Sequence, residues 1–397
     1  MFPVIERESA SPLLVALIVT AQFACTSLWF AGNAVVPELQ AYLKLGPEAV
    51  SQVTSSVQFG FISGTLVFAM LGIADRFSPS RVFLVSAILG AAANVGVVFL
   101  SGGLIPLLTL RFLTGFFLAG IYPVGMKIAS DHHRRGLGLA LGFLVGALVL
   151  GTAFPHFVRG FLQDVPWRNV FYTTTALALA GGLIVGLLVP DGPFRKPVAK
   201  PDFSAFFRVF GKADFRAAAF GYFGHMWELY SFWAFIPLAL GAYMASHPEL
   251  MWNVPLFTFS IIAIGGVTCA LGGVLSSRFG SEKVAFVALS LSGLCCLLSP
   301  LFYSLPPLLF GSLFVLWGMS VSPDSPQFST LVATTAPEAS KGTALTIVNS
   351  VGFAITIPSI LLLGETFKAL PTEYAFLVLV PGPVFGLIGM SRLLKKR

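Results

Sequence analysis

The sequence carries very little charge. Only 10% of its 397 residues are Asp, Glu, Lys or Arg and 56% are hydrophobic, whereas about 25% charged residues is usual in a soluble domain. A soluble core cannot bury so much apolar surface, which excludes an ordinary water-soluble protein. The mean hydropathy of +0.86 instead indicates a chain whose solvent is mostly lipid.

Cysteine is also scarce, and its positions matter more than its number. The four cysteines, at positions 25, 269, 295 and 296, all lie inside apolar runs. This placement argues against a disulfide framework and against a zinc site. We interpret the cysteines as small packing residues and expect neither a metal nor a cofactor.

Long apolar runs dominate the chain. Leu13 to Val36, Val50 to Ile73 and Leu104 to Ile128 each exceed the roughly 20 residues of a membrane-spanning helix and lack the alternation of a membrane barrel strand. Hydropathy predicts an all-α membrane protein with twelve transmembrane helices, over residues 13–36, 50–73, 82–100, 104–128, 137–158, 170–189, 217–240, 254–275, 284–302, 308–332, 344–363 and 374–390.

The basic residues are distributed unevenly between the predicted loops. Nineteen of the 24 Lys and Arg residues fall on the side of the N-terminus, and only four, Lys44, Arg159, Arg168 and Lys368, fall on the other side. Because positively charged loops stay in the cytoplasm, we expect both termini to be cytoplasmic in a plasma (inner) membrane. The same distribution explains the formal charge of +7, and we expect no nucleic-acid partner.

The longest polar connection divides the chain in two. It contains four prolines, followed by phenylalanines among basic residues, and this composition indicates a linker with a short interfacial amphipathic helix. The predicted units are an N-terminal six-helix bundle (1–190), a cytoplasmic linker (191–216) and a C-terminal six-helix bundle (217–397).

The two predicted bundles resemble each other. Gly115 and Pro123 in the fourth helix recur as Gly318 and Pro326 in the tenth, each 203 positions later. Pseudo-symmetric repeats of six helices are typical of alternating-access transporters, which bind their substrate between the repeats near the membrane midplane.

Three short motifs resemble those of a known family. They are Asp75-Arg76-Phe77 after helix two, Arg111 to Gly115 in helix four, and Trp167-Arg168 before helix six. With the twelve helices and the repeated halves, the whole chain resembles the major facilitator superfamily. The resemblance implies solute transport by rocking of the two bundles, and it implies that Asp75 and Arg76 form a conformational gate.

Helix seven carries two ionisable residues on one face. His225 and Glu228 are three positions apart, and charged residues inside a membrane helix usually face a cavity. A desolvated histidine and glutamate this close can exchange a proton near neutral pH, so we predict an ion-coupling pair. A static hydrogen-bonded pair that stiffens the helix is the alternative.

Polar residues in the first half predict a substrate site. The first helix carries a stripe of polar and aromatic side chains, and helix four contributes one arginine and one tyrosine. Polar residues that knit helices together, and a purely structural partner for the arginine, are the alternatives. The candidate substrate-binding residues are Gln22, Thr26, Trp29, Asn33, Arg111 and Tyr122.

Helix ten is predicted to be broken. Pro323 and Pro326 flank Asp324, and an acid among freed carbonyl groups can ligate a cation or a polar substrate. We add Asp324 to the ion-coupling residues, and Gln327 and Asn349 to the substrate-binding residues. A kink that Asp324 merely caps is the alternative.

These observations predict a secondary transporter rather than an enzyme. The substrate is expected to be a small polar or amphipathic organic molecule. We also expect transport to be coupled to protons and the protein to lie in the lipid bilayer as a monomer. The stretch from Gly142 to Gly151 in helix five lacks the Gly-Pro step of drug/proton antiporters, which favours symport. Proton-coupled efflux by antiport is the alternative, and an intramembrane enzyme or a non-transporting receptor is the rival from another class.

The topology can be tested directly. Single cysteines at Lys200 and at Lys44, each in a cysteine-free background, should react with membrane-impermeant reagents from opposite faces of the membrane, because the basic loops lie on one side. Labelling of both positions from the same face would contradict the twelve-helix topology.

Overall fold

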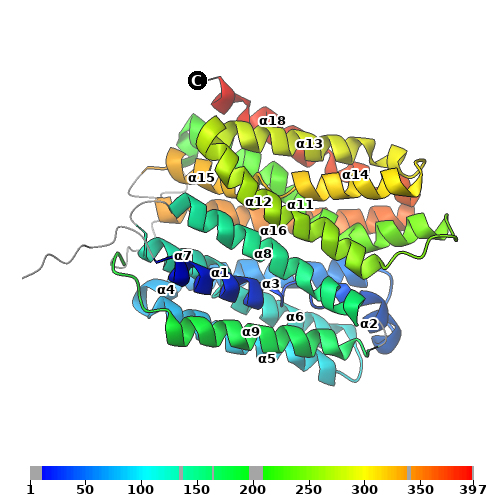
Figure 1. Ribbon diagram of the computed structural model, residues 1–397, viewed down its shortest axis with the longest axis horizontal. Coiled ribbons are helices and arrows are strands. Elements are labelled where there is room, and N and C mark those ends of the chain that lie inside the picture. The colour runs from blue at the N-terminus through cyan, green and yellow to red at the C-terminus, as the bar shows by residue number, and fades with distance from the viewer. Residues whose placement is uncertain (1–10, 134–136, 163–164, 196–208, 338–340, 396–397) are drawn as a thin grey trace, which may run out of the picture.

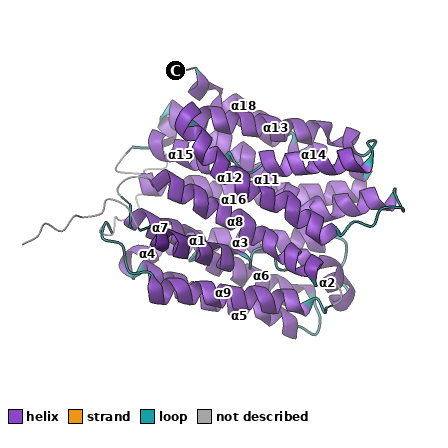
Figure 2. Cartoon of the chain, in the orientation of Figure 1, coloured by secondary structure: helices purple, strands orange, loops and turns teal. Residues whose placement is uncertain are grey.

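The computed structural model describes residues 11–133, 137–162, 165–195, 209–337 and 341–395 (Figure 1). In these ranges the chain consists of helices joined by short loops (Figure 2). The predicted amphipathic helix of the linker falls largely within residues 196–208, as does Lys200, and lies outside the described residues.

The first half begins with a broken helix. Its elements are α1 (Pro12–Thr26), η1 (Asn33–Val35), α2 (Val36–Leu43), α3 (Ala49–Leu71), α4 (Ile73–Arg76), α5 (Pro79–Gly96), η2 (Val97–Phe99), α6 (Leu104–Leu118), α7 (Tyr122–Asp131), α8 (Leu137–Phe161) and α9 (Arg168–Leu188).

The second half begins with the longest helix. Its elements are α11 (Ala213–Ala245), α12 (Val254–Phe279), α13 (Ser281–Phe302), α14 (Pro307–Ser320), α15 (Ser325–Thr335), α16 (Lys341–Ala369), α17 (Thr372–Ala375), η4 (Phe376–Leu379) and α18 (Pro381–Leu394).

Nine helical segments of the described chain are long and apolar enough to cross a membrane. The remaining three predicted spans are α1, which has only 15 residues, the broken pair α14 and α15, and α11, whose aromatic and polar residues lower its hydropathy. The fold is therefore an all-α membrane protein, and its arrangement is consistent with twelve spans.

Two helices predicted as continuous are broken. The first predicted helix stops at Thr26, where the hydroxyls of Thr26 and Ser27 donate to the carbonyls of Gln22 (2.8 Å) and Ala24 (2.7 Å). Such side-chain bonds compete with the helical pattern and bend the chain. The fourth is divided into α6 and α7 because Pro123, at the start of α7, has no N–H for the preceding turn.

The third break was expected. Helix α14 ends at Ser320 and α15 begins at Ser325, around the two prolines that the sequence places there. By contrast, Pro155, Pro237 and Pro358 lie inside uninterrupted helices, so proline alone does not locate a break.

Within each half, the helices pack mainly on one another. In the first half α1 packs on α8 and α9, and α3 packs on α6; in the second, α11 packs on α16 and α18, and α12 packs on α14. The halves meet where α8 lies along α12 and where α3 lies along α16, in the middle of the molecule (Figure 1). The division at residues 190 and 217 stays a prediction.

One close contact between two helices, at a glycine, occurs at matching positions in both halves. An added Cβ at Gly115 of α6 would lie 2.0 Å from the carbonyl oxygen of Val57 in α3, and one at Gly318 of α14 would lie 2.0 Å from that of Ile261 in α12. Only a residue without a side chain permits such close approach of two helices. The repeat seen in the sequence is therefore a repeat of helix packing.

This equivalence predicts matched losses of stability. Gly115→Ala and Gly318→Ala should each destabilise the purified protein by about 1–3 kcal/mol, the usual cost of overpacking, and lower its melting temperature in detergent. Gly273→Ala is the control, because a Cβ there would meet nothing within 4 Å. Equal melting temperatures for all three variants would contradict the close packing.

Candidate functional site

The break in helix one is stabilised by a buried arginine. Arg111 of α6 is 0% exposed, and its Nη2 donates to the carbonyls of Leu28 (2.9 Å) and Trp29 (2.6 Å), while Nη1 donates to Asn94 Oδ1 (3.1 Å). Helix α1 ends before these two carbonyls, so they need donors from elsewhere. The guanidinium supplies them and thereby fixes the segment that carries Trp29.

Arg111 has no carboxylate partner among the described residues. The sequence left open whether it pairs with an acid during the working cycle, and in this conformation neither Glu228 nor Asp324 contacts it. Its amide partner Asn94 in turn donates to Thr174 Oγ1 of α9 (3.0 Å), so Arg111 belongs to a network that ties α5, α6 and α9 to the segment that follows α1.

Aromatic rings join the two halves at the break. Trp29 lies 4.8 Å from Phe61 of α3, 5.6 Å from Tyr230 of α11 and 5.8 Å from Phe353 of α16, between ring centroids. Phe30 contacts His156 of α8 and both Tyr230 and Trp233 of α11, each at 6.4 Å. We call these side chains the central aromatic cluster: Trp29, Phe30, Phe61, His156, Tyr230, Trp233 and Phe353.

Of the polar and aromatic stripe of helix one, only Trp29 belongs to this cluster. Gln22 is fully buried, and neither atom of its amide has a hydrogen-bond partner among the described residues. Thr26 donates to Gln22 O and also lies 3.4 Å from Ala147 O of α8, so it joins helices rather than facing a ligand. Asn33 donates to Thr54 Oγ1 of α3 (2.6 Å).

The other predicted substrate residues lie on three further helices, α7, α15 and α16. Tyr122 is buried at the start of α7, and Gln327 is buried on α15 beside Gly272 of α12. Asn349 is half-buried on α16, one turn before Phe353. Of the predicted substrate-binding side chains, only Trp29 is part of the central aromatic cluster.

The predicted pairing of His225 with Glu228 is wrong in this structure. His225 Nδ1 instead lies 3.0 Å from Asp324 Oδ1, and both side chains are at most 1% exposed. Neither side chain has a hydrogen-bond partner among the described residues, so the pair is a close contact between two ionisable groups. Asp324 stands before α15 without capping it through its side chain, which argues against the capping alternative.

Glu228 faces a different part of the second half. Its Oε1 accepts from Trp317 Nε1 of α14 (2.7 Å) and its Oε2 from Ser292 Oγ of α13 (2.9 Å). His225 and Glu228 share one stripe of α11, but that helix is enclosed by neighbours, so residues about 60° apart on its circumference meet different helices. Glu228 and Asp324 are both 0% exposed. The two hydrogen-bond donors of Glu228 are neutral.

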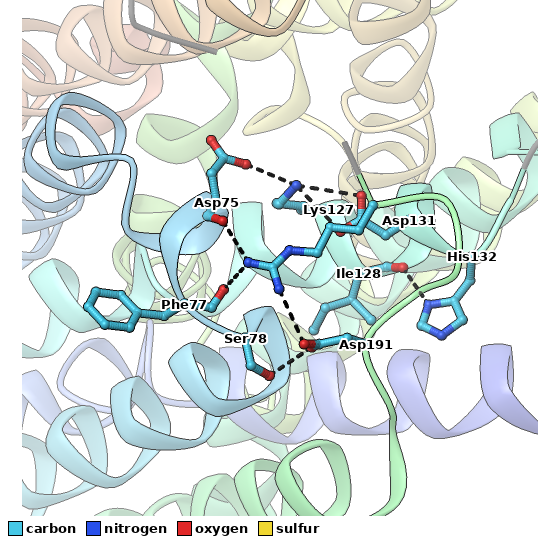
Figure 3. Close-up of polar contacts among 9 residues, drawn as sticks. Asp75, Phe77, Ser78, Lys127, Ile128, Asp131, His132 and Asp191 are labelled. Carbon is cyan, nitrogen blue, oxygen red and sulfur yellow. Dashed lines mark hydrogen bonds and ion pairs between the residues drawn. The ribbon is translucent and has the colours of Figure 1, made fainter. Parts of the chain in front are cut away.

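The predicted gate residues lie at the end of the molecule where the linker begins, which we call the linker end. Asp75 Oδ1 lies 3.0 Å from Lys127 Nζ of α7, and Lys127 also contacts Asp131 at 3.4 Å (Figure 3). Arg195 donates to the carbonyl of Asp75 (2.6 Å). Arg76 is exposed, and of the two predicted gate residues it is Asp75 for which the structure describes a charge pair.

Three hydrogen-bond partners of the buried charges were not predicted from the sequence: Asn94, Ser292 and Trp317. Asn94 could have been found, because a lone amide in an apolar helix indicates a polar partner nearby. Ser292 and Trp317 gave no such signal, because a serine and a tryptophan are unremarkable in membrane helices and only the packing of α13 and α14 brings them to Glu228.

A membrane-embedded fold of two repeated halves, with broken helices and buried charges at the breaks, defines a transporter. The family profile of the Major Facilitator Superfamily matches residues 17–360, and the chain belongs to this family. It is therefore an integral membrane transporter that handles small molecules.

Relatives at higher identity match a shorter segment. The chain is 35% identical over 165 residues to the multidrug resistance protein MdtL of Salmonella paratyphi B, and equally to that of Salmonella newport. Each match spans 38% of this chain and 38% of the relative.

Solved structures agree with the fold over nearly the whole chain. One is a bacterial homologue of the human lysosomal transporter Spinster, in an inward-facing and unoccupied conformation, with a TM-score of 0.66, 16% identity and 96% of both chains covered. Another is a mutant of the nucleoside transporter NupG, with a TM-score of 0.69, 14% identity, and 96% of this chain and 99% of that chain covered. At these identities the likeness concerns the fold.

The Arg111 network predicts a specific kinetic effect. Arg111→Lys keeps the charge but cannot donate to two carbonyls and an amide at once, so initial transport rates in proteoliposomes should fall about tenfold, as expected for about 1.4 kcal/mol. The shape of the pH profile should not change, because no acid loses its partner. Arg278→Lys, at an exposed position of α12, is the control. An upward shift of the pH optimum would show that Arg111 pairs with an acid elsewhere in the cycle.

Proposed function

We propose that this chain is a proton-driven exporter of small amphipathic organic molecules, with His225 and Asp324 as its proton site. One observation carries the proposal: a buried histidine and a buried aspartate lie 3.0 Å apart where helix ten is broken. A carboxylate and an imidazole in contact can pass a proton between them, and a break between α14 and α15 can respond to the change of charge.

The position of this pair suits coupling. It lies in the second half, with His225 on α11 itself, and α11 also carries Tyr230 and Trp233 of the central aromatic cluster. A change of charge at His225 therefore acts on the helix that contacts the first half. Coupling of two sites needs such a shared element with two arrangements.

Export rather than uptake is favoured by the relatives. The matched segments belong to proteins named for multidrug resistance. Export that is driven by protons flowing into the cell requires antiport. The sequence alone favoured symport, because α8 lacks a Gly-Pro step. In the structure α8 instead approaches α12 through glycine, since a Cβ on Gly146 would lie 3.0 Å from the carbonyl of Gly266. Close contact without proline serves either direction of transport, so the relatives decide our choice.

The orientation in the membrane follows from the basic loops. We propose that the linker end faces the cytoplasm, because the hydropathy pattern of the sequence assigns nineteen of the 24 basic residues to the predicted loops of that side. The opposite end then faces outward. There, Glu48 Oε2 lies 3.7 Å from Lys368 Nζ, and Asn253 Nδ2 donates to Gly160 O (2.9 Å).

These two contacts join the halves at the outer end. One is an ion pair and the other a hydrogen bond, whereas the described pair of Asp75 and Lys127 at the linker end lies within the first half. We propose that the structure corresponds to the state closed toward the outside, and that the outer contacts separate when the bundles rock.

Coupling can be tested in everted vesicles. Asp324→Asn and His225→Gln remove a titrating group and nearly keep the shape, so proton-driven accumulation should be lost while exchange of labelled solute at equal pH persists. The solute is a compound that stabilises the wild-type protein in a thermal-shift screen. Glu365→Gln is the matched control, because this acid on α16 is 70% exposed.

Three outcomes are informative. Proton-driven accumulation that survives in Asp324→Asn and fails in Glu228→Gln would move the proton site to Glu228. Accumulation in right-side-out vesicles rather than in everted ones would replace export by symport. Absence of any gradient-driven movement with every stabilising compound would overturn the proposed function.

A further inference from the structure

Several ring side chains of the central aromatic cluster have unused polar atoms. Trp29 Nε1, Tyr230 Oη, Trp233 Nε1 and His156 Nε2 are buried and have no hydrogen-bond partner among the described residues. Each of these side chains is at most 2% exposed. Gln58 of α3, one turn before Phe61, is also fully buried, and both atoms of its amide lack a partner.

This pattern does not serve stability. A buried polar atom without a partner costs free energy, and lipid supplies no substitute. Phenylalanine would fill the positions of Tyr230 and Trp233 without that cost. Packing therefore does not explain why several unpartnered polar groups lie in one place. A ligand that forms hydrogen bonds with these groups in another conformation would explain it.

The shape of the cluster indicates the form of that ligand. The ring of Trp29 is inclined by 27° to Tyr230 and by 26° to Phe353, whereas Tyr230 and Phe353 are inclined by 50° to each other. Trp29, from the first half, is therefore roughly parallel to each of two rings from the second half. Flat rings favour a flat aromatic guest that stacks between them. Because Trp29 belongs to the first half and the other two to the second, separation of the halves exposes their faces.

The charges around the cluster limit the ligand further. None of the seven cluster residues is Asp, Glu, Lys or Arg. Arg111 lies nearby, but its Nη groups donate to backbone carbonyls and to Asn94, and its positive charge disfavours a cation. Glu228 is bound by Ser292 and Trp317. No described side chain of the cluster thus offers a charge to neutralise a charged ring.

We propose that the central aromatic cluster binds uncharged, planar aromatic molecules that carry both a hydrogen-bond donor and an acceptor, such as fused-ring lactams. The proposal rests on the proposed transport function and specifies its substrate class. Tyr230 and Trp233 supply hydrogen bonds from the second half, and the Gln58 amide, which can donate and accept at once, matches the paired N–H and C=O of a lactam.

The test compares three related compounds. Phenanthridinone is a neutral lactam, N-methylphenanthridinone lacks its donor, and N-methylphenanthridinium has a similar ring system with a positive charge. Binding to the purified wild-type protein is measured by equilibrium dialysis without a proton gradient. The lactam should bind, the N-methyl lactam should bind about tenfold more weakly, and the cation should bind most weakly.

Conservative variants locate the site. Tyr230→Phe and Trp233→Phe keep a ring and remove one polar group, so each should weaken phenanthridinone binding about five- to tenfold and reduce its preference over the N-methyl lactam. Tyr303→Phe is the matched control, because Tyr303 Oη is also buried without a described partner but lies outside the cluster. Melting temperatures verify that each variant is folded.

The outcomes separate this proposal from the proposed function. Tighter binding of the cation, or equal binding of all three compounds by wild type and both cluster variants, would overturn the proposed substrate class and leave proton-driven export standing. Selective lactam binding by a protein that shows no proton-driven movement of phenanthridinone would support the class and count against the coupling.

Discussion

The hydrocarbon interior of a membrane offers no hydrogen-bond partners, and the rest of this structure depends on how the chain meets that constraint. Unbroken helices satisfy their own backbone, but a broken helix frees carbonyl groups that need donors. At the first break Arg111 donates to the carbonyls of Leu28 and Trp29. At the break between α14 and α15, Cys269 Sγ lies 3.1 Å from Ser322 O. At both of these breaks a side chain from a neighbouring helix therefore supplies the donor.

The same two breaks hold the chemistry. One places Trp29 at the contact between the halves, and the other places Asp324 beside His225. Backbone that is not helical can present atoms and side chains in directions that a regular helix does not allow, which is why transporters place their binding sites at such points. The buried charges at the breaks are functional candidates for the same reason.

Glycine makes the relative motion of the halves plausible on physical grounds. Within each half, Gly115 and Gly318 let neighbouring helices touch backbone to backbone, which makes each bundle a compact unit. Between the halves, Gly146 lies against Gly266, and the side chain of Leu150 packs on Gly266 beside it. Because neither glycine has a side chain of its own, few rotamers have to change at this point when the halves move apart.

One helix connects the candidate proton site with the candidate substrate site. Helix α11 carries His225, Glu228, Tyr230 and Trp233 within nine residues, and all four are buried. Its enclosed position explains why neighbouring residues on it reach different partners. A change of charge at His225 and the occupancy of the central aromatic cluster would then act on the same rigid element, which is the physical requirement for coupling.

The sequence by itself determined the membrane class, the helical spans, the repeat of the two halves and the break at Pro323, because hydropathy, charge distribution and proline act locally and can be read from position alone. It also singled out Arg111, Glu228 and Asp324 as buried charges. Only the tertiary structure decided that His225 meets Asp324 and not Glu228, and that Arg111 caps the break in helix one. Helical periodicity fixes the direction in which a side chain points along its own helix, but the identity of its partner depends on which neighbouring helix packs there.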